Sequence, residues 1–184
     1  MFRRRIPHGW YRRIRDFFWP RSGWRRSSTY VAHRIGRLPG TPYSIAAGFA
    51  CGAAVSFTPL IGLHFALAAL LALLVRGNLL ASALGTAVGN PWTFPGIWLA
   101  TYRLGSMVAG QPAEALTPEG LTLMLIVEQP GQVFLPMMVG GTLAGIVAWF
   151  LFFFPVRAGV SAYRARSLMR RTKKARHRKL ELEA

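Results

Sequence analysis

The chain has 184 residues, of which 52% are hydrophobic, and its formal net charge is +17. A soluble nucleic-acid-binding domain is excluded, because the charges lie at the two ends: residues 1–40 hold eleven Arg and residues 156–184 hold ten Lys and Arg. Long apolar stretches with few charges are typical of membrane proteins. We therefore predict a basic arm (1–40), a membrane domain (41–155) and a basic tail (156–184).

The basic arm has the pattern of an interfacial helix. Trp10, Ile14, Phe17 and Phe18 recur at helical spacing, with arginines between them. This pattern predicts a short helix in the headgroup plane, with its guanidinium groups towards anionic lipid. No apolar stretch follows the first arginines, so we do not expect a secretory signal. A cytoplasmic anchor is the simplest interpretation. A specific lipid-binding role, nucleic-acid binding and an organellar transit peptide are the alternatives.

Two interrupted apolar segments open the membrane domain. Residues 43–75 exceed one ordinary span of about 20 residues and are interrupted at Phe57-Thr58-Pro59. Residues 79–109 break at Asn90-Pro91. A proline removes a backbone donor and disfavours helix at the residue before it, so the chain has to turn or kink at each break.

The third apolar segment, residues 137–154, is the most conventional span and ends in aromatic residues before Pro155. A loop that holds three Glu and a short apolar run at 121–127 precedes it. Because Lys and Arg mark the cytoplasmic side, both termini are expected there, and the number of crossings is then even. We predict an all-α, polytopic integral membrane protein with two helix-break-helix hairpins, re-entrant or not, and one further transmembrane helix.

The first two segments share a pattern. Each contains two glycines four residues apart, which clear one helix face for close packing, and then a break rich in Thr and Pro. Paired interrupted segments also mark midplane binding sites in transporters. Three interpretations follow: a kink satisfied by its own Asn and Thr side chains, a small polar site between two facing breaks, or a break that lies at a membrane interface. The candidate break residues are Thr58, Pro59, His64, Asn90, Pro91 and Thr93. The packing glycines are Gly48, Gly52, Gly85, Gly89, Gly141 and Gly145.

Three further residues are candidates for contacting an anionic headgroup or solute. Arg76 and Asn78 lie in the tight link between the first two segments, and Arg103 follows the second break by about two helical turns. The simpler role of the first pair is cytoplasmic anchoring and helix capping, and Arg103 can extend to an interface. His64 is either a hydrogen-bonded packing residue or a proton carrier.

No constellation of catalytic residues is present in the sequence. The four histidines show no metal-ligand spacing, and there is no nucleophile elbow, P-loop or dinucleotide fingerprint. The single Cys51 excludes an intramolecular disulfide. We therefore expect no enzyme activity, no metal and no cofactor.

Several short motifs carry a resemblance to a known family. They are Pro42-x-x-Ile-Ala-x-Gly48, Thr58-Pro59-x-x-Gly-x-His64, Arg76-x-Asn78, Gly85-Thr-x-x-x-Asn90-Pro91-x-Thr93 and Tyr102-x-x-Gly105. Over about residues 40–155 the chain resembles the bacterial membrane proteins grouped as domain-of-unknown-function (DUF) family 2062. The resemblance implies an inner-membrane protein with a compact helical core, and it implies no activity.

Three hypotheses for function follow. The first is a small transport or permeation module, or one that binds anionic lipid headgroups, built on the paired breaks. The second is a structural or adaptor protein whose basic arms bind anionic lipid or a protein partner. The third, a nucleic-acid tether through residues 171–179, has the least support because that stretch lacks interleaved aromatic residues. A chain with so few spans would need to form a homo-oligomer to enclose a pathway.

Overall fold

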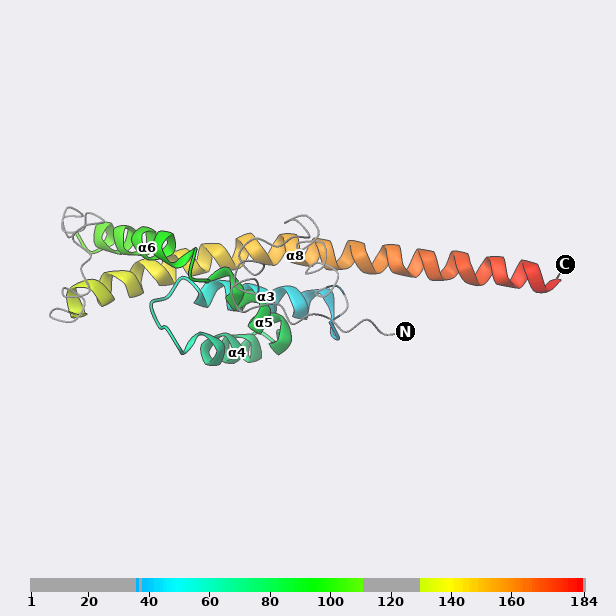
Figure 1. Ribbon diagram of the computed structural model, residues 1–184, viewed down its shortest axis with the longest axis horizontal. Helices are drawn as coiled ribbons and strands as arrows, with labels where there is room; N and C mark the ends of the chain where they lie inside the picture. Colours follow the sequence, from blue (N-terminus) through cyan, green and yellow to red (C-terminus); the bar gives the residue numbers. More distant parts are fainter. Residues whose placement is uncertain (1–35, 37, 111–129, 184) are drawn as a thin grey trace, which may run out of the picture. The chain divides into compact units, whose positions relative to one another are not determined.

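The computed structural model describes residues 36, 38–110 and 130–183 (Figure 1). The chain divides into two compact units, Met1–Arg37 and Leu38–Ala184. The predicted interfacial helix of the arm and the loop with the apolar run 121–127 lie outside the described residues.

Every element in the described part of the larger unit is a helix, so the predicted all-α class is confirmed. The first break separates two helices, and the second lies between a short 3-10 turn and the next helix. In chain order the elements are α3 (Pro42–Val55), α4 (His64–Leu74), α5 (Leu79–Gly85), η1 (Thr86–Val88), α6 (Phe94–Val108) and α8 (Pro130–Glu183).

Helices α3 and α4 form an antiparallel hairpin. The Tyr43 hydroxyl donates to the carbonyl oxygen of Val75 at 3.4 Å, which places the start of α3 beside the end of α4. At the other end, His64 Nε2 lies 3.2 Å from the carbonyl oxygen of Thr58. Gly62 has a φ of 88° in the turn between them, a conformation open mainly to glycine. The first apolar segment is therefore a helix-break-helix hairpin.

Helix α5 runs parallel to α3, with the two backbones in contact. A Cβ atom added to Gly48 would collide with the Asn78 carbonyl oxygen, and one added to Gly52 would collide with that of Ser82. The contacts advance in the same order along both helices, so the two helices point the same way. Small residues permit this close approach.

Helix α6 continues along α8 and does not fold back beside α5. A Cβ atom on Gly140 would meet the carbonyl oxygen of Thr101, and one on Gly105 would meet that of Pro136. The prediction of a second hairpin is therefore wrong: α5, η1 and α6 form one broken helix. The physical reason is that glycine faces on α6 and α8 offer the second half-helix a partner beyond the end of α3.

Helix α8 is antiparallel to both α3 and α6, which lie one after the other along it (Figure 1). A Cβ atom on Gly145 would lie 2.8 Å from the carbonyl oxygen of Ala54, and one on Gly141 would collide with that of Phe57. One part of α8 therefore packs against α3 of the hairpin, and the part before it in the chain packs against α6.

Helix α8 contains the third apolar segment, 137–154, and extends beyond it at both ends. Helix α8 begins at Pro130 and runs for 54 residues to Glu183, about 80 Å at 1.5 Å per residue. Pro136 and Pro155 both lie inside it. An internal proline removes one backbone hydrogen bond, but the helix continues through Pro155, whose side chain is exposed, and Val156 packs on the core.

Small side chains form the core, and large apolar side chains cover much of the surface. Ala46, Ala47 and Ala50 of α3 are fully buried and pack with Phe153 of α8. Exposed fractions reach 71% at Leu74 and 66% at Leu151. Among the described helices, α8 alone is long and apolar enough to cross a membrane, and only a third of its most apolar window is buried. The coarser prediction of a membrane helix thus has one candidate.

Candidate functional site

Asn78 joins the hairpin to the broken helix. Its Oδ1 accepts from the backbone N–H of Ala81 at 2.9 Å and so caps α5. Its Nδ2 donates to the carbonyl oxygen of Pro39 at 2.7 Å, and its backbone N–H donates to that of Ser44, also at 2.7 Å. Both functional groups of the side chain therefore have partners within the protein.

Arg76 occupies the link just before Asn78 and has a left-handed φ of 54°. Non-glycine residues adopt this conformation only when the surroundings require it. Here the neighbouring Gly77 packs directly against α3: a Cβ atom on Gly77 would lie 2.7 Å from the backbone nitrogen of Gly48. This contact holds Arg76 in the left-handed conformation. The link is held tightly against α3, while the Arg76 side chain is exposed.

The first break satisfies its polar groups locally. The Thr58 hydroxyl donates to the carbonyl oxygen of Val55 at 2.8 Å. The Ser56 hydroxyl lies 3.0 Å from the carbonyl oxygen of Gly52 and 3.2 Å from that of Thr86. Pro59 is half-buried, and His64 is only 8% exposed.

The second break is a compact turn built by Asn90 and Thr93. Asn90 Oδ1 accepts from the backbone N–H groups of Trp92 and Thr93, at 2.9 and 3.1 Å. The Thr93 hydroxyl donates to the carbonyl oxygen of Val88 at 2.7 Å and lies 3.0 Å from the backbone nitrogen of Asn90. Pro91, Trp92 and Thr93 are exposed on the surface of the described chain. This arrangement is what the sequence analysis described as a kink whose polar groups are satisfied by its own Asn and Thr side chains.

The two breaks lie next to each other. Besides the bond from Ser56 to Thr86, a Cβ atom on Gly89 would lie 2.8 Å from that of Ser56. The rings of His64 and Phe94 have centroids 5.8 Å apart. The structure therefore brings the paired breaks together through one hydrogen bond and close packing.

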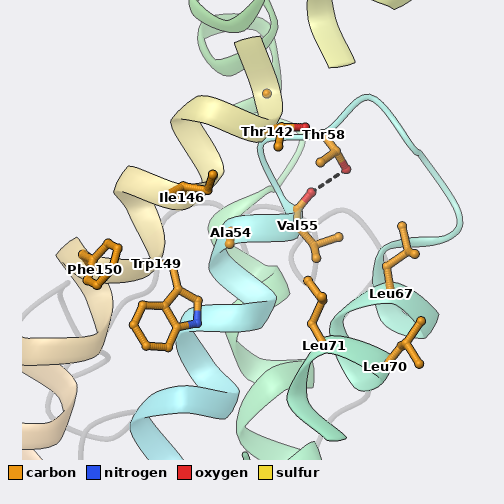
Figure 2. A pocket seen from close by; sticks show the side chains of 12 residues that line it. Ala54, Val55, Thr58, Leu67, Leu70, Leu71, Thr142, Ile146, Trp149 and Phe150 are labelled. Atoms are coloured by element: carbon orange, nitrogen blue, oxygen red, sulfur yellow. Dashed lines mark hydrogen bonds between the residues drawn. The ribbon is translucent and has the colours of Figure 1, made fainter. Parts of the chain in front are cut away.

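The cavity that borders the first break is apolar. It has a volume of about 440 Å³ and lies between α4 and α8, over the end of α3. Figure 2 shows Leu70 and Leu71 of α4 on one side of Val55 and Trp149 and Phe150 of α8 on the other. We call this cavity the apolar groove. Its lining also includes Thr58, Thr142, Ile146, Gly141 and Gly145.

Arginines collect where the hairpin begins and ends. The ring of Tyr43, whose hydroxyl reaches Val75, lies 5.7 Å from that of Phe153. The Arg157 guanidinium stands 5.9 Å from the Phe153 ring centroid. Arg76 directly follows Val75, and Arg164 donates to the carbonyl oxygen of Leu38 at 3.0 Å. We call Arg76, Arg157 and Arg164 the basic end.

Arg103 does not belong to the basic end. It lies on α6 between Thr101 and Gly105, whose contacts on α8 are at Gly140 and Pro136. From Phe153 to Gly140 is about 20 Å along the helix axis. The candidate headgroup contacts Arg76 and Arg103 are thus far apart, and they cannot hold one small anion together.

Sequence reasoning missed several contacts that hold the unit together. Gly105 and Gly140 permit the α6–α8 approach, but neither belongs to the glycine pairs that were singled out. The Trp149 indole N–H donates to the Cys51 sulfur at 3.4 Å. No spacing rule could have found that pair, because its members are 98 positions apart.

The elements define an all-helical unit assembled around one helix with the length and composition of a membrane span. The chain belongs to the family described as uncharacterized protein conserved in bacteria (DUF2062), whose model matches residues 25–169. The family match confirms the resemblance and is wider than expected, since it includes parts of the basic arm and of the tail. No curated protein and no solved structure matches the chain.

Proposed function

We propose that this protein is a module of the bacterial inner membrane that binds anionic lipid headgroups at its basic end. In this proposal α5–η1–α6 and α8 each cross the bilayer, and α3–α4 enters and leaves on the same side. Two crossings place both termini in the cytoplasm, as the positive-inside rule requires of two basic ends. The tip of the hairpin and the break before α6 then lie at membrane depth, where hydrogen bonds within each turn satisfy their polar groups.

The observation that carries the proposal is the separation of charge along α8. Residues 130–156 contain no charged side chain, whereas residues 157–179 contain ten Lys and Arg. One continuous helix therefore has an apolar part and a cationic part, and the first cation, Arg157, lies within a turn of Pro155. Such a boundary is what a helix needs where it leaves the hydrocarbon and meets anionic headgroups.

The basic end has no acidic partner in the described chain around it. Residues 38–110 and 130–180 contain no Asp or Glu. An anion that neutralises Arg76 and Arg157 therefore comes from outside these segments, and lipid phosphate is the anion most abundant at a membrane surface. Arginine suits this role because its guanidinium group makes paired hydrogen bonds to phosphate.

Native mass spectrometry of the full chain in detergent tests the proposal, with dioleoyl-phosphatidylglycerol compared with dioleoyl-phosphatidylcholine. We expect the anionic lipid to bind about thirtyfold more tightly, since Arg76 and Arg157 near lipid each contribute about 1 kcal/mol. The double variant Arg76→Gln, Arg157→Gln should lose this preference. Arg103→Gln, far from the basic end, is the matched control and should keep it. Equal affinity of the wild-type chain for the two lipids would overturn the proposal.

A permeation role is the second candidate. It is favoured by the juxtaposition of two broken elements, an arrangement that transporters use at their binding sites. Against it, the hydroxyls of Ser56, Thr58 and Thr93 all contact backbone carbonyls within the unit. Phosphate or chloride efflux from proteoliposomes, compared with empty vesicles, decides between the two roles. If proteoliposomes leak no faster than empty vesicles while the protein still prefers anionic lipid, headgroup binding is the function that remains.

A further inference from the structure

The apolar groove has one chemical character throughout. Among its twelve lining residues only Thr58, Thr142 and Trp149 carry a polar side-chain atom, and the Trp149 indole N–H donates to Cys51. The Thr58 hydroxyl donates to the carbonyl oxygen of Val55 at 2.8 Å, and the Thr142 hydroxyl donates to that of Met138 at 2.7 Å. Both donors are used within their own segments, so the groove presents a hydrocarbon surface. Its occupant must be apolar where it lies against the walls.

The groove is also elongated and large enough for a ligand. Its α8 wall extends from Gly141 to Phe150, about 14 Å along the helix axis. Its volume of about 440 Å³ falls within the range of small-molecule pockets. Leu70, Ile146 and Phe150 remain more than half exposed, which leaves a substantial apolar area to be covered. A long, narrow hydrocarbon surface suits an extended alkyl chain.

The groove leads towards the basic end. Arg157 follows Phe150 by seven residues, so it lies on the same face of α8 about 10 Å further along the axis. On the opposite wall, Arg76 follows Leu71 by five residues, at the end of α4. Both walls therefore run from hydrocarbon to an exposed arginine in the same direction. This polarity matches a molecule with an anionic head and an apolar tail.

We propose that the apolar groove holds one acyl chain of an anionic phospholipid whose phosphate contacts Arg157 and Arg76. The inference rests on the proposed headgroup function and adds a binding site for the acyl chain. Charge complementarity selects lipid over a second copy of the chain. A second copy that packed α8 side by side in the same orientation would bring two cationic ends together, whereas an anionic lipid neutralises one.

The test fills the groove without touching the basic end. Thr142→Phe places a ring in the groove from an exposed position, and Leu143→Phe, at the neighbouring exposed position outside the lining, is the matched control. Dioleoyl- and dihexanoyl-phosphatidylglycerol are titrated into each full-length variant in detergent and followed by native mass spectrometry. The short-chain lipid carries the same headgroup but reaches little of the groove.

We expect Thr142→Phe to weaken binding of the dioleoyl lipid about tenfold, the contribution of roughly two buried methylene groups, and to leave the dihexanoyl lipid unchanged. Leu143→Phe should bind both lipids as the wild type does. Leu70→Ala, which removes wall area without overfilling, should weaken the dioleoyl lipid in the same way. This second variant keeps the test decisive if Thr142→Phe does not fold.

Two results would overturn the inference. In the first, Thr142→Phe and Leu70→Ala bind the dioleoyl lipid like the control, while the preference for anionic over zwitterionic lipid persists; headgroup binding then stands without a groove ligand. In the second, the groove variants change the oligomeric state with lipid binding intact, which identifies a second copy as the occupant. Failure of the headgroup proposal would look different: the wild-type protein would bind dioleoyl-phosphatidylglycerol and dioleoyl-phosphatidylcholine equally well.

Discussion

The backbone N–H of Asn78 donates to the carbonyl oxygen of Ser44 at 2.7 Å. This bond fastens the start of the broken helix to the first turn of the hairpin. It explains why the link through Arg76 and Gly77 is so short: the chain leaves α4, turns against α3 and begins α5 within four residues. The base of the hairpin and the base of the broken helix are therefore one structural joint.

Asn78→Ala should destabilise this joint. The substitution removes the cap of α5 and the bond to Pro39, at a combined cost of about 2 kcal/mol. Asn78→Asp keeps the capping oxygen and should recover about half of the loss. Thermal unfolding of the three proteins in the same detergent measures the order. Equal midpoints for Asn78→Ala and the wild type would show that the joint does not depend on this side chain.

Gly105→Ala should separate α6 from α8. The added methyl group would collide with the carbonyl oxygen of Pro136, and overpacking of this kind costs about 1–3 kcal/mol. Gly96→Ala in the same helix meets no neighbouring atom within 4 Å and should be neutral or stabilising by up to about 1 kcal/mol. Cross-linking yield between cysteines placed on α6 and α8, together with unfolding midpoints, checks both variants. Similar behaviour of the two would contradict the close approach.

Thr93→Val tests whether the second break is a structural kink. Valine keeps the shape but removes the oxygen that bonds Val88 and Asn90, at a cost of about 2 kcal/mol. We expect lower abundance in the membrane and a lower unfolding midpoint, both restored by Thr93→Ser. A normal midpoint with a lost lipid-binding or flux signal would instead assign Thr93 to a ligand site.

In the proposed topology, the end of α6 and the end of the apolar part of α8 lie on opposite sides of the membrane. In a Cys51→Ser background, a cysteine replaces Ala109 at the end of α6 or Ala158 beyond Pro155, both exposed positions. A membrane-impermeant maleimide should label Ala109→Cys in spheroplasts and Ala158→Cys only after the membrane is permeabilised. Labelling of both from the same face would reject two crossings.

The sequence located both breaks but could not give the direction of the chain after each. Thr58-Pro59 and Asn90-Pro91 interrupt their helices where the local rules predict. Whether the next half-helix returns or continues depends on its packing partner, which is α3 for α4 and α8 for α6. Helix α8 begins at Pro130, far along the chain from the second break, and the residues of the first break do not specify that α4 packs back on α3.

The sequence likewise predicted some features of the candidate site and not others. The spacing of Gly48 and Gly52 predicted a close helix contact without naming α5 as its partner. The apolar groove was not foreseen, because it is assembled from three helices and leucines such as Leu70 resemble ordinary lipid-facing residues in the sequence. The sequence also did not indicate that the helix continues through Pro155, where packing on both sides outweighs one missing hydrogen bond.

The unbroken course of α8 through Pro155 limits which cations can sense a lipid surface. At 1.5 Å per residue, Lys173 lies about 24 Å beyond Arg157 along the axis. The Debye length at physiological ionic strength is about 8 Å, so a helix that stays straight and upright carries its distal lysines out of the surface potential. Only the first two or three turns of the cationic stretch then interact with phosphate groups, and the rest extends into screened aqueous solvent.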